Sequence, residues 1–210
     1  MKHLNKLGGV NVAKDFLKAV EDRRSIYVIS NEKVVPEERI EEVVKFAVKH
    51  TPYSFNATSG RVVVLFGEEH NKLWELAKDE LRKIVPVENF ADTEGRIDGF
   101  KAGYGTVLFF EDQEVVKGLQ EQMALYKDNF PIWSEQASGM LQFVVWTALE
   151  NEGLGATLQH YNPLIDEGVK QHWHTPDSWV LRAQMPFGKP EIKAGEKEFQ
   201  PLEERVKVFK

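Results

Sequence analysis

An almost uninterrupted apolar run from Gly139 to Leu149 constrains the fold of this chain most strongly. Apart from Gln142 and Thr147, every side chain within it is apolar. A helix with this pattern has no polar face and must be buried on every side. The other helices of one domain, together with a second copy of the chain, would supply the partners. We expect Gly153 to end the helix, because glycine readily adopts the left-handed conformation of helix ends.

Length and composition predict one globular domain over residues 1–210, with the first ten residues flexible. The formal net charge of -6 and the pI near 5.6 disfavour nucleic acid and anionic membranes as partners, because both attract clustered positive charge. The lack of cysteine excludes disulfides, thiol catalysis and cysteine metal sites. No apolar signal core stands near the start, and no apolar run of about 18 residues follows. We therefore predict a cytoplasmic protein.

Helical and strand-like segments intermix without the regular alternation of a doubly wound fold, which favours the α+β class. Asn11 or Asp15 is expected to cap the first helix, and Asn162, followed by Pro163, the last. Helices are predicted at residues 16–25, 36–49, 68–84, 96–102, 111–129 and 162–173, besides the central helix that contains the run 139–149. Strands are predicted at residues 61–67, 104–110, 178–187 and 205–209, with 156–158 as a sheet edge or a turn. The last strand follows a loop and pairs with its own sheet or with that of a neighbouring subunit.

The common cofactor and catalytic motifs are missing. Gly153-Leu154-Gly155 follows a helix, whereas a dinucleotide fingerprint follows a strand. The chain has neither a phosphate-binding P-loop nor a G-x-S-x-G nucleophile motif. Its six histidines lack zinc-protease spacing, and His172 and His174, two residues apart, cannot share one helix face. No metal site is predicted, and hydrolase chemistry is disfavoured.

Three remaining stretches suit a ligand with an anionic tail, a polyol and a flat polar ring. Two arginines and a serine after the first helix can bind an anion, although a solvated charge run has the same composition. A loop of small hydroxyl and amide side chains precedes a predicted strand, and turn chemistry alone also explains it. Bare backbone follows the central helix. These stretches are Arg23 to Ser25, the loop with Ser54 and Asn56, and Gly155 to His160.

Four motifs, in the same order along the chain, resemble the FMN-dependent nitroreductases. R-R-S-I at residues 23–26 precedes a T-P-x-S-x-N loop that leads into an apolar strand. The strings DGFKAGYGTVLFFED, FPIWSEQASGM and GLGATLQHYNPLID resemble the small bacterial and fungal nitroreductases in particular. The resemblance covers essentially residues 14–209.

This resemblance implies an α+β homodimer with a mostly antiparallel central sheet flanked by helices, and with two FMN sites shared between subunits. In such a homodimer the C-terminal strand either pairs with its own sheet or is exchanged between the subunits. FMN would carry electrons from NADH or NADPH to nitroaromatic or quinone-like acceptors in a ping-pong reaction, with no obligatory catalytic side chain. A non-catalytic flavin-binding or sensory protein on the same fold is the alternative.

The resemblance also assigns the cofactor-binding residues. Those for the FMN phosphate and ribityl chain are Arg23, Arg24 and Ser25, with Lys197 and Arg205 as further candidates for the phosphate. Ser54 and Asn56 would reach the flavin from the other subunit, and the backbone around Leu158, Gln159 and His160 would line the isoalloxazine edge.

One departure from the family pattern lies in the loop before the first long strand. Many members have N-x-Q after the loop serine, whereas this chain has Asn56-Ala57-Thr58. Thr58 or Arg61 is the candidate to replace the glutamine, although Arg61 is equally a strand-edge charge. Four aromatic residues either shape the substrate side or pack in the core or interface, namely Phe55, Tyr104, Phe130 and Trp133.

Overall fold

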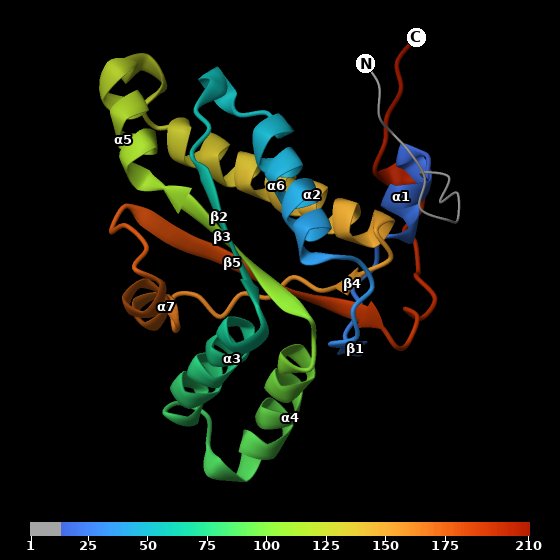
Figure 1. Ribbon diagram of the computed structural model, residues 1–210. Helices are drawn as coiled ribbons and strands as arrows, with labels where there is room; N and C mark the ends of the chain where they lie inside the picture. The colour runs from blue at the N-terminus through green and yellow to red at the C-terminus, as the bar shows by residue number, and fades with distance from the viewer. Residues whose placement is uncertain (1–13) are drawn as a thin grey trace.

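The computed structural model describes residues 14–210 of the chain (Figure 1). The predicted flexibility of the first ten residues and the alternative cap Asn11 lie outside this range. Asp15 caps the first helix, since its side chain accepts a hydrogen bond of 3.1 Å from the backbone N–H of Leu17.

A five-stranded antiparallel sheet forms the centre of the molecule, in the order β1-β5-β3-β2, with β4 also paired to β5. This arrangement confirms the predicted α+β class with a mostly antiparallel sheet. The strands are β1 (Ile29–Ser30), β2 (Gly60–Phe66), β3 (Gly105–Asp112), β4 (Gly155–Ala156) and β5 (Trp179–Pro190).

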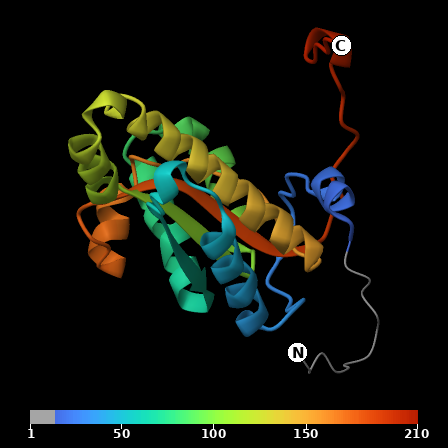
Figure 2. The same ribbon diagram turned by 90° about the horizontal axis from the view of Figure 1, so that it is seen from above.

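Helices cover both faces of this sheet (Figures 1 and 2). On one face, α2 and α6 pack against Val107 and Phe109 of β3. On the other, α3, α4 and α7 enclose Leu108 and Phe110 of the same strand. Successive strand residues point to opposite faces, so β3 is apolar throughout because it feeds two cores. The helices are α1 (Phe16–Asp22), α2 (Glu37–His50), α3 (Gly67–Arg82), α4 (Phe90–Lys101), α5 (Gln113–Gln122), α6 (Phe130–Asn151) and α7 (Asp166–Trp173).

Two predicted helices have wrong boundaries. Helix α4 begins at Phe90 instead of residue 96. Helix α6, which begins at Phe130, extends well before the apolar run that predicted it. Helix α5 is shorter than predicted, because Glu111 and Asp112 belong to β3 and the Asp112 side chain caps the helix at the Glu114 N–H.

The predicted start of the last helix at Asn162 is also wrong. The Asn162 Oδ1 accepts a hydrogen bond of 3.4 Å from Gln184 Nε2, while Gln184 Oε1 accepts one of 2.7 Å from the Tyr161 N–H. These bonds attach the segment to β5, and α7 begins only at Asp166.

Strand β5 continues past its predicted end to Pro190, because Gly188 pairs with Gly155 of β4 and Pro190 with Ile29 of β1. Sequence patterning missed β1, a strand of only two residues. The strand predicted at residues 205–209 does not form in the single chain. The C-terminal segment instead has a short 3-10 turn at Leu202–Glu204.

Helix α6 is only partly buried in the single chain. Leu141 and Leu149 face the core, whereas Met140 is 42% exposed and Phe143 36% exposed. For this helix to be buried on every side, as expected, a surface from outside the single chain must cover these residues.

His70 of α3 lies in the core beneath the sheet. Its Nε2 is 3.0 Å from the carbonyl oxygen of Lys101, and its Nδ1 is 2.8 Å from the Thr106 hydroxyl. A carbonyl only accepts, so Nε2 carries the proton of the neutral ring and Nδ1 accepts from Thr106. Burial lowers the pKa of His70 to about 4, well below its ordinary value near 6.5.

We expect His70 to make the fold acid-sensitive. Its folded pKa lies below its unfolded pKa, so protonation favours the unfolded chain, and the stability present above about pH 6.5 is lost as the pH falls towards 4. Between pH 7 and pH 4.5 the loss should be about 2 kcal/mol. Denaturant unfolding of wild type and His70→Gln at both pH values measures it. Parallel pH dependence of the two proteins would contradict the expectation.

Candidate functional site

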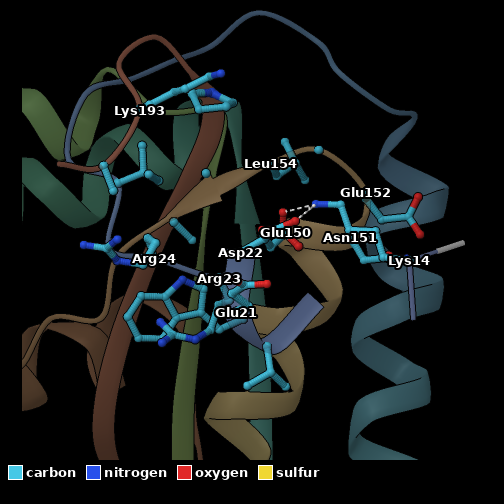
Figure 3. Close-up of a pocket in the computed structure, with 18 of the residues that line it drawn as sticks. Lys14, Glu21, Asp22, Arg23, Arg24, Glu150, Asn151, Glu152, Leu154 and Lys193 are labelled. Atoms are coloured by element: carbon cyan, nitrogen blue, oxygen red, sulfur yellow. Dashed lines mark hydrogen bonds and ion pairs between the residues drawn. The ribbon is translucent and has the colours of Figure 1, made fainter. Parts of the chain in front are cut away.

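A cavity of about 1090 Å³ lies between α1, the end of α6, β4 and the segment after β5 (Figure 3). Its volume is that of a site for a cofactor-sized molecule. Arg23, Arg24 and Lys197, three of the predicted site residues, line it together with Lys193 and the backbone of Gly155.

The end of α1 carries the two arginines into the cavity. Arg23 is the C-terminal cap of the helix, and its N–H donates to the Ala19 carbonyl at 3.0 Å. The chain then joins the sheet: Ser25 forms a bridge to Ala156, and the Ile26 N–H donates to the Ala156 carbonyl at 3.0 Å. Arg24 is thus held between a helix end and a strand.

Four of the cations that line this cavity lack protein counter-ions, whereas a fifth, Lys14, pairs with Asp22 and Glu150. Within residues 14–210, neither Arg23, Arg24, Lys193 nor Lys197 forms an ion pair, and the buried Nε of Arg23 has no hydrogen-bond partner. Burial, and next the charge of Arg24, lower the pKa of Arg23 from its usual value. An unsatisfied buried donor beside unpaired cations fits an anionic ligand such as the phosphate of FMN.

Gly153 ends α6 as predicted, with φ of +84°. The bare backbone at Gly155, predicted to lie against a flat ligand, also has a packing cause within the chain. A Cβ on Gly155 would lie 2.9 Å from Ile26 Cγ2 and 3.1 Å from Pro190 Cβ, so this glycine allows strands to pack closely.

The loop with Ser54, Asn56 and Thr58 lies outside this cavity. No residue from 51 to 60 lines it. Phe55, Asn56 and Thr58 have φ of 54°, 52° and 47°, a left-handed conformation that costs non-glycine residues about 1–2 kcal/mol each. The loop therefore needs contacts from residues outside it to hold this conformation. Its predicted contact with the flavin of a second subunit stays a prediction.

Arg61 supplies part of that support. Its Nη1 donates to the Thr58 carbonyl at 2.7 Å, and its Nη2 lies 2.9 Å from Asp112 Oδ2. Within the single chain, Arg61 therefore acts as a strand-edge charge that holds the loop in its strained conformation.

Glu111, which sequence reasoning missed, supports the same loop. Its fully buried carboxylate accepts hydrogen bonds from Ser59 at 2.5 Å and from Ser134 at 2.6 Å. Burial raises the pKa of Glu111. The only sequence signal was an acidic residue at the end of an apolar strand.

The segment of Leu158, Gln159 and His160 continues from β4 along β5. The Gln159 N–H donates to the Gln184 carbonyl at 2.7 Å, and the Gln184 N–H returns a bond of 2.9 Å. None of the three predicted residues lines the cavity, and neither does Arg205, which ends the exposed turn near the C-terminus. Lys193 was missed, because the extension of β5 that carries it there was predicted as a loop.

The four candidate aromatic residues divide into two groups. Phe55 is 52% exposed and stacks on Trp133 with ring centroids 5.9 Å apart. Phe130 is buried beneath them, and the Tyr104 hydroxyl donates to Glu37 at 3.1 Å. Phe55 and Trp133 therefore present an aromatic surface, whereas Phe130 and Tyr104 have packing roles.

A model of the nitroreductase family matches residues 20–189. The chain belongs to the nitroreductase family. Nitroreductase CinD from Lactococcus lactis, in complex with chloramphenicol, is 50% identical with a TM-score of 0.86, over 93% of this chain and 100% of CinD. Its complex with 4-nitrophenol gives a TM-score of 0.85 over the same shares of both chains. In Saccharomyces cerevisiae, nitroreductase FRM2 is 31% identical over 88% of this chain and 93% of FRM2.

Membership makes this chain an oxidoreductase of a flavin-dependent family. Among residues 14–210, no group of His, Asp and Glu side chains is arranged to hold a metal ion, and no helix is long and apolar enough to cross a membrane.

Proposed function

We propose that this nitroreductase binds FMN in the cavity around Arg23 and transfers electrons from NADH or NADPH to nitroaromatic or quinone-like acceptors. The cluster of cations without protein counter-ions carries the proposal, because it offers charge-assisted hydrogen bonds to a phosphate. When bound, FMN supplies the two-electron redox chemistry.

Under this proposal the protein binds and orients, and it needs no side-chain acid or base. Arg23, Arg24 and Lys197 would hold the phosphate, with Ser25 beside the ribityl chain. The chain from Ala156 onwards would follow the isoalloxazine edge, fixed by the backbone bonds between Gln159 and Gln184. Fixed main-chain and cationic groups need no reorganisation as charge develops on the ring.

The CinD complexes support a nitroaromatic acceptor, given the 50% identity between the two chains. The exposed ring of Phe55, stacked on the half-buried Trp133, offers stacking to such a flat molecule. Oxidation of NADH and of NADPH, each with 4-nitrophenol or a quinone as acceptor, tests the function. FMN bound without turnover would support the alternative, a flavin-binding or sensory protein.

The same proposal includes a homodimer in the cytoplasm, with the loop of Ser54, Asn56 and Thr58 reaching the partner's flavin. The exposed face of α6 supports it. So does the C-terminal segment, which leaves the body of the molecule and exposes Val206, Val208 and Phe209 (Figure 2). An exposed alternating segment suits a strand exchanged with a second subunit.

Met140→Glu should convert this dimer into a monomer that retains little flavin, because it places a charge on the apolar face of α6. Val87→Glu is the matched control, since Val87 is 90% exposed and lies on a turn before α4. Light scattering with absorbance detection measures mass and flavin together. A monodisperse, flavin-loaded monomer of the wild type would remove the dimer from the proposal.

A further inference from the structure

Trp146, a residue of α6 assigned no role so far, lies against the Arg23 side chain. The guanidinium carbon of Arg23 is 4.3 Å from the centre of the Trp146 ring and 5.9 Å from that of Phe143. A guanidinium at this distance over an indole face is attracted by the electrons of the ring. Two helices thus meet through a cation and a ring at the wall of the cavity.

The carboxylates around the cavity bind other cations. Asp22 pairs with Lys18 at 2.7 Å, and Lys14 bonds both Asp22 and Glu150. Glu152 pairs with Arg39 at 2.7 Å. Figure 3 shows the Lys14–Glu150 pair on one side of the cavity and Arg24 with Lys193 on the other. Acids that would otherwise attract Arg23 are therefore already engaged.

A ring and a carboxylate hold a guanidinium in different ways. A carboxylate occupies the N–H groups at the edge of the guanidinium, whereas a ring contacts its face and leaves those donors available. The orphaned Nε of Arg23 agrees with this difference, since it is buried and without a partner among residues 14–210.

We infer that Trp146 is a positioning residue, which holds the Arg23 guanidinium by its face so that its edge is free to bind the phosphate of FMN. This inference rests on the proposed function. Its consequence is specificity: Trp146 favours a phosphorylated flavin over riboflavin, which has the same ring and ribityl chain but no phosphate.

Flavin titration of the apoprotein tests the role of Trp146 without an activity assay. In Trp146→Leu, FMN affinity should fall about 5- to 10-fold, the size expected of a partly buried cation–π contact. Riboflavin affinity should stay within about 2-fold of the wild-type value. Trp146→Phe, which keeps an aromatic face, should retain most of the preference for FMN.

A double-mutant cycle separates positioning from simple packing. In an Arg23→Ala background, Trp146→Leu should leave the ratio of FMN to riboflavin affinity unchanged, because the side chain that it positions is gone. With Arg23 present, an unchanged ratio of FMN to riboflavin affinity in Trp146→Leu, as after an equal loss of both affinities, would overturn the inference. A wild-type protein that binds neither FMN nor riboflavin would contradict both this inference and the proposed function.

Discussion

FMN binding should weaken by about 100-fold or more when Arg23 and Arg24 are both replaced by alanine. A hydrogen bond to a charged group contributes about 1.5–3 kcal/mol, so the loss of two removes about 3–6 kcal/mol, which is 100-fold or more in affinity. No carboxylate among residues 14–210 is paired with these two arginines, and Lys193 and Lys197 would remain to hold the phosphate weakly.

The measurement is the FMN dissociation constant of the apoprotein, together with the flavin content of the protein as purified. Lys18→Ala is the matched control, because Lys18 is a cation on the same helix whose side chain does not line the cavity, although its partners Glu21 and Asp22 do. Unchanged flavin content in the double variant would refute the placement of the phosphate at the end of α1.

Gly188→Ala should cost the fold about 3 kcal/mol or more. A Cβ at this position would lie 2.4 Å from the Ser30 carbonyl oxygen and 3.0 Å from the Tyr104 backbone nitrogen. Both atoms belong to the main chain, so they cannot move aside as a flexible side chain would, and the strands around β5 must separate. Because β4 holds Ser25 at Ala156, flavin binding should weaken as well.

Denaturant unfolding of the Gly188→Ala variant measures this cost. Gly195→Ala provides the control, since a Cβ there meets no atom within 4 Å and the residue follows the same strand. Equal stability of the two variants would contradict the close approach of β1, β3 and β5.

Hydrophobic periodicity predicted the elements that fill the two cores. Helices α2 and α3 and strands β2 and β3 appear close to their predicted positions, because each has an apolar face or run of full length. The short strands β1 and β4 have only two residues each and carry no periodicity of their own. Their existence depends on partners in β5 that are far away in the chain.

The site was predicted only where neighbouring residues act together. The run Arg23-Arg24-Ser25 carries its own signal, and the structure takes both arginines into one cavity. Lys193 and Trp146 reach that cavity through the extension of β5 and the packing of α1 on α6, which no local pattern reveals. The tasks of Arg61 and Glu111 likewise depend on contacts between β2, β3 and α6.

The visible absorption spectrum of the purified protein, recorded anaerobically before and after addition of NADH or NADPH, tests the account most directly. We expect flavin bands that bleach with the reductant and return when a nitroaromatic compound or a quinone is added. A colourless protein that takes up no added FMN, although it is folded, would contradict the account.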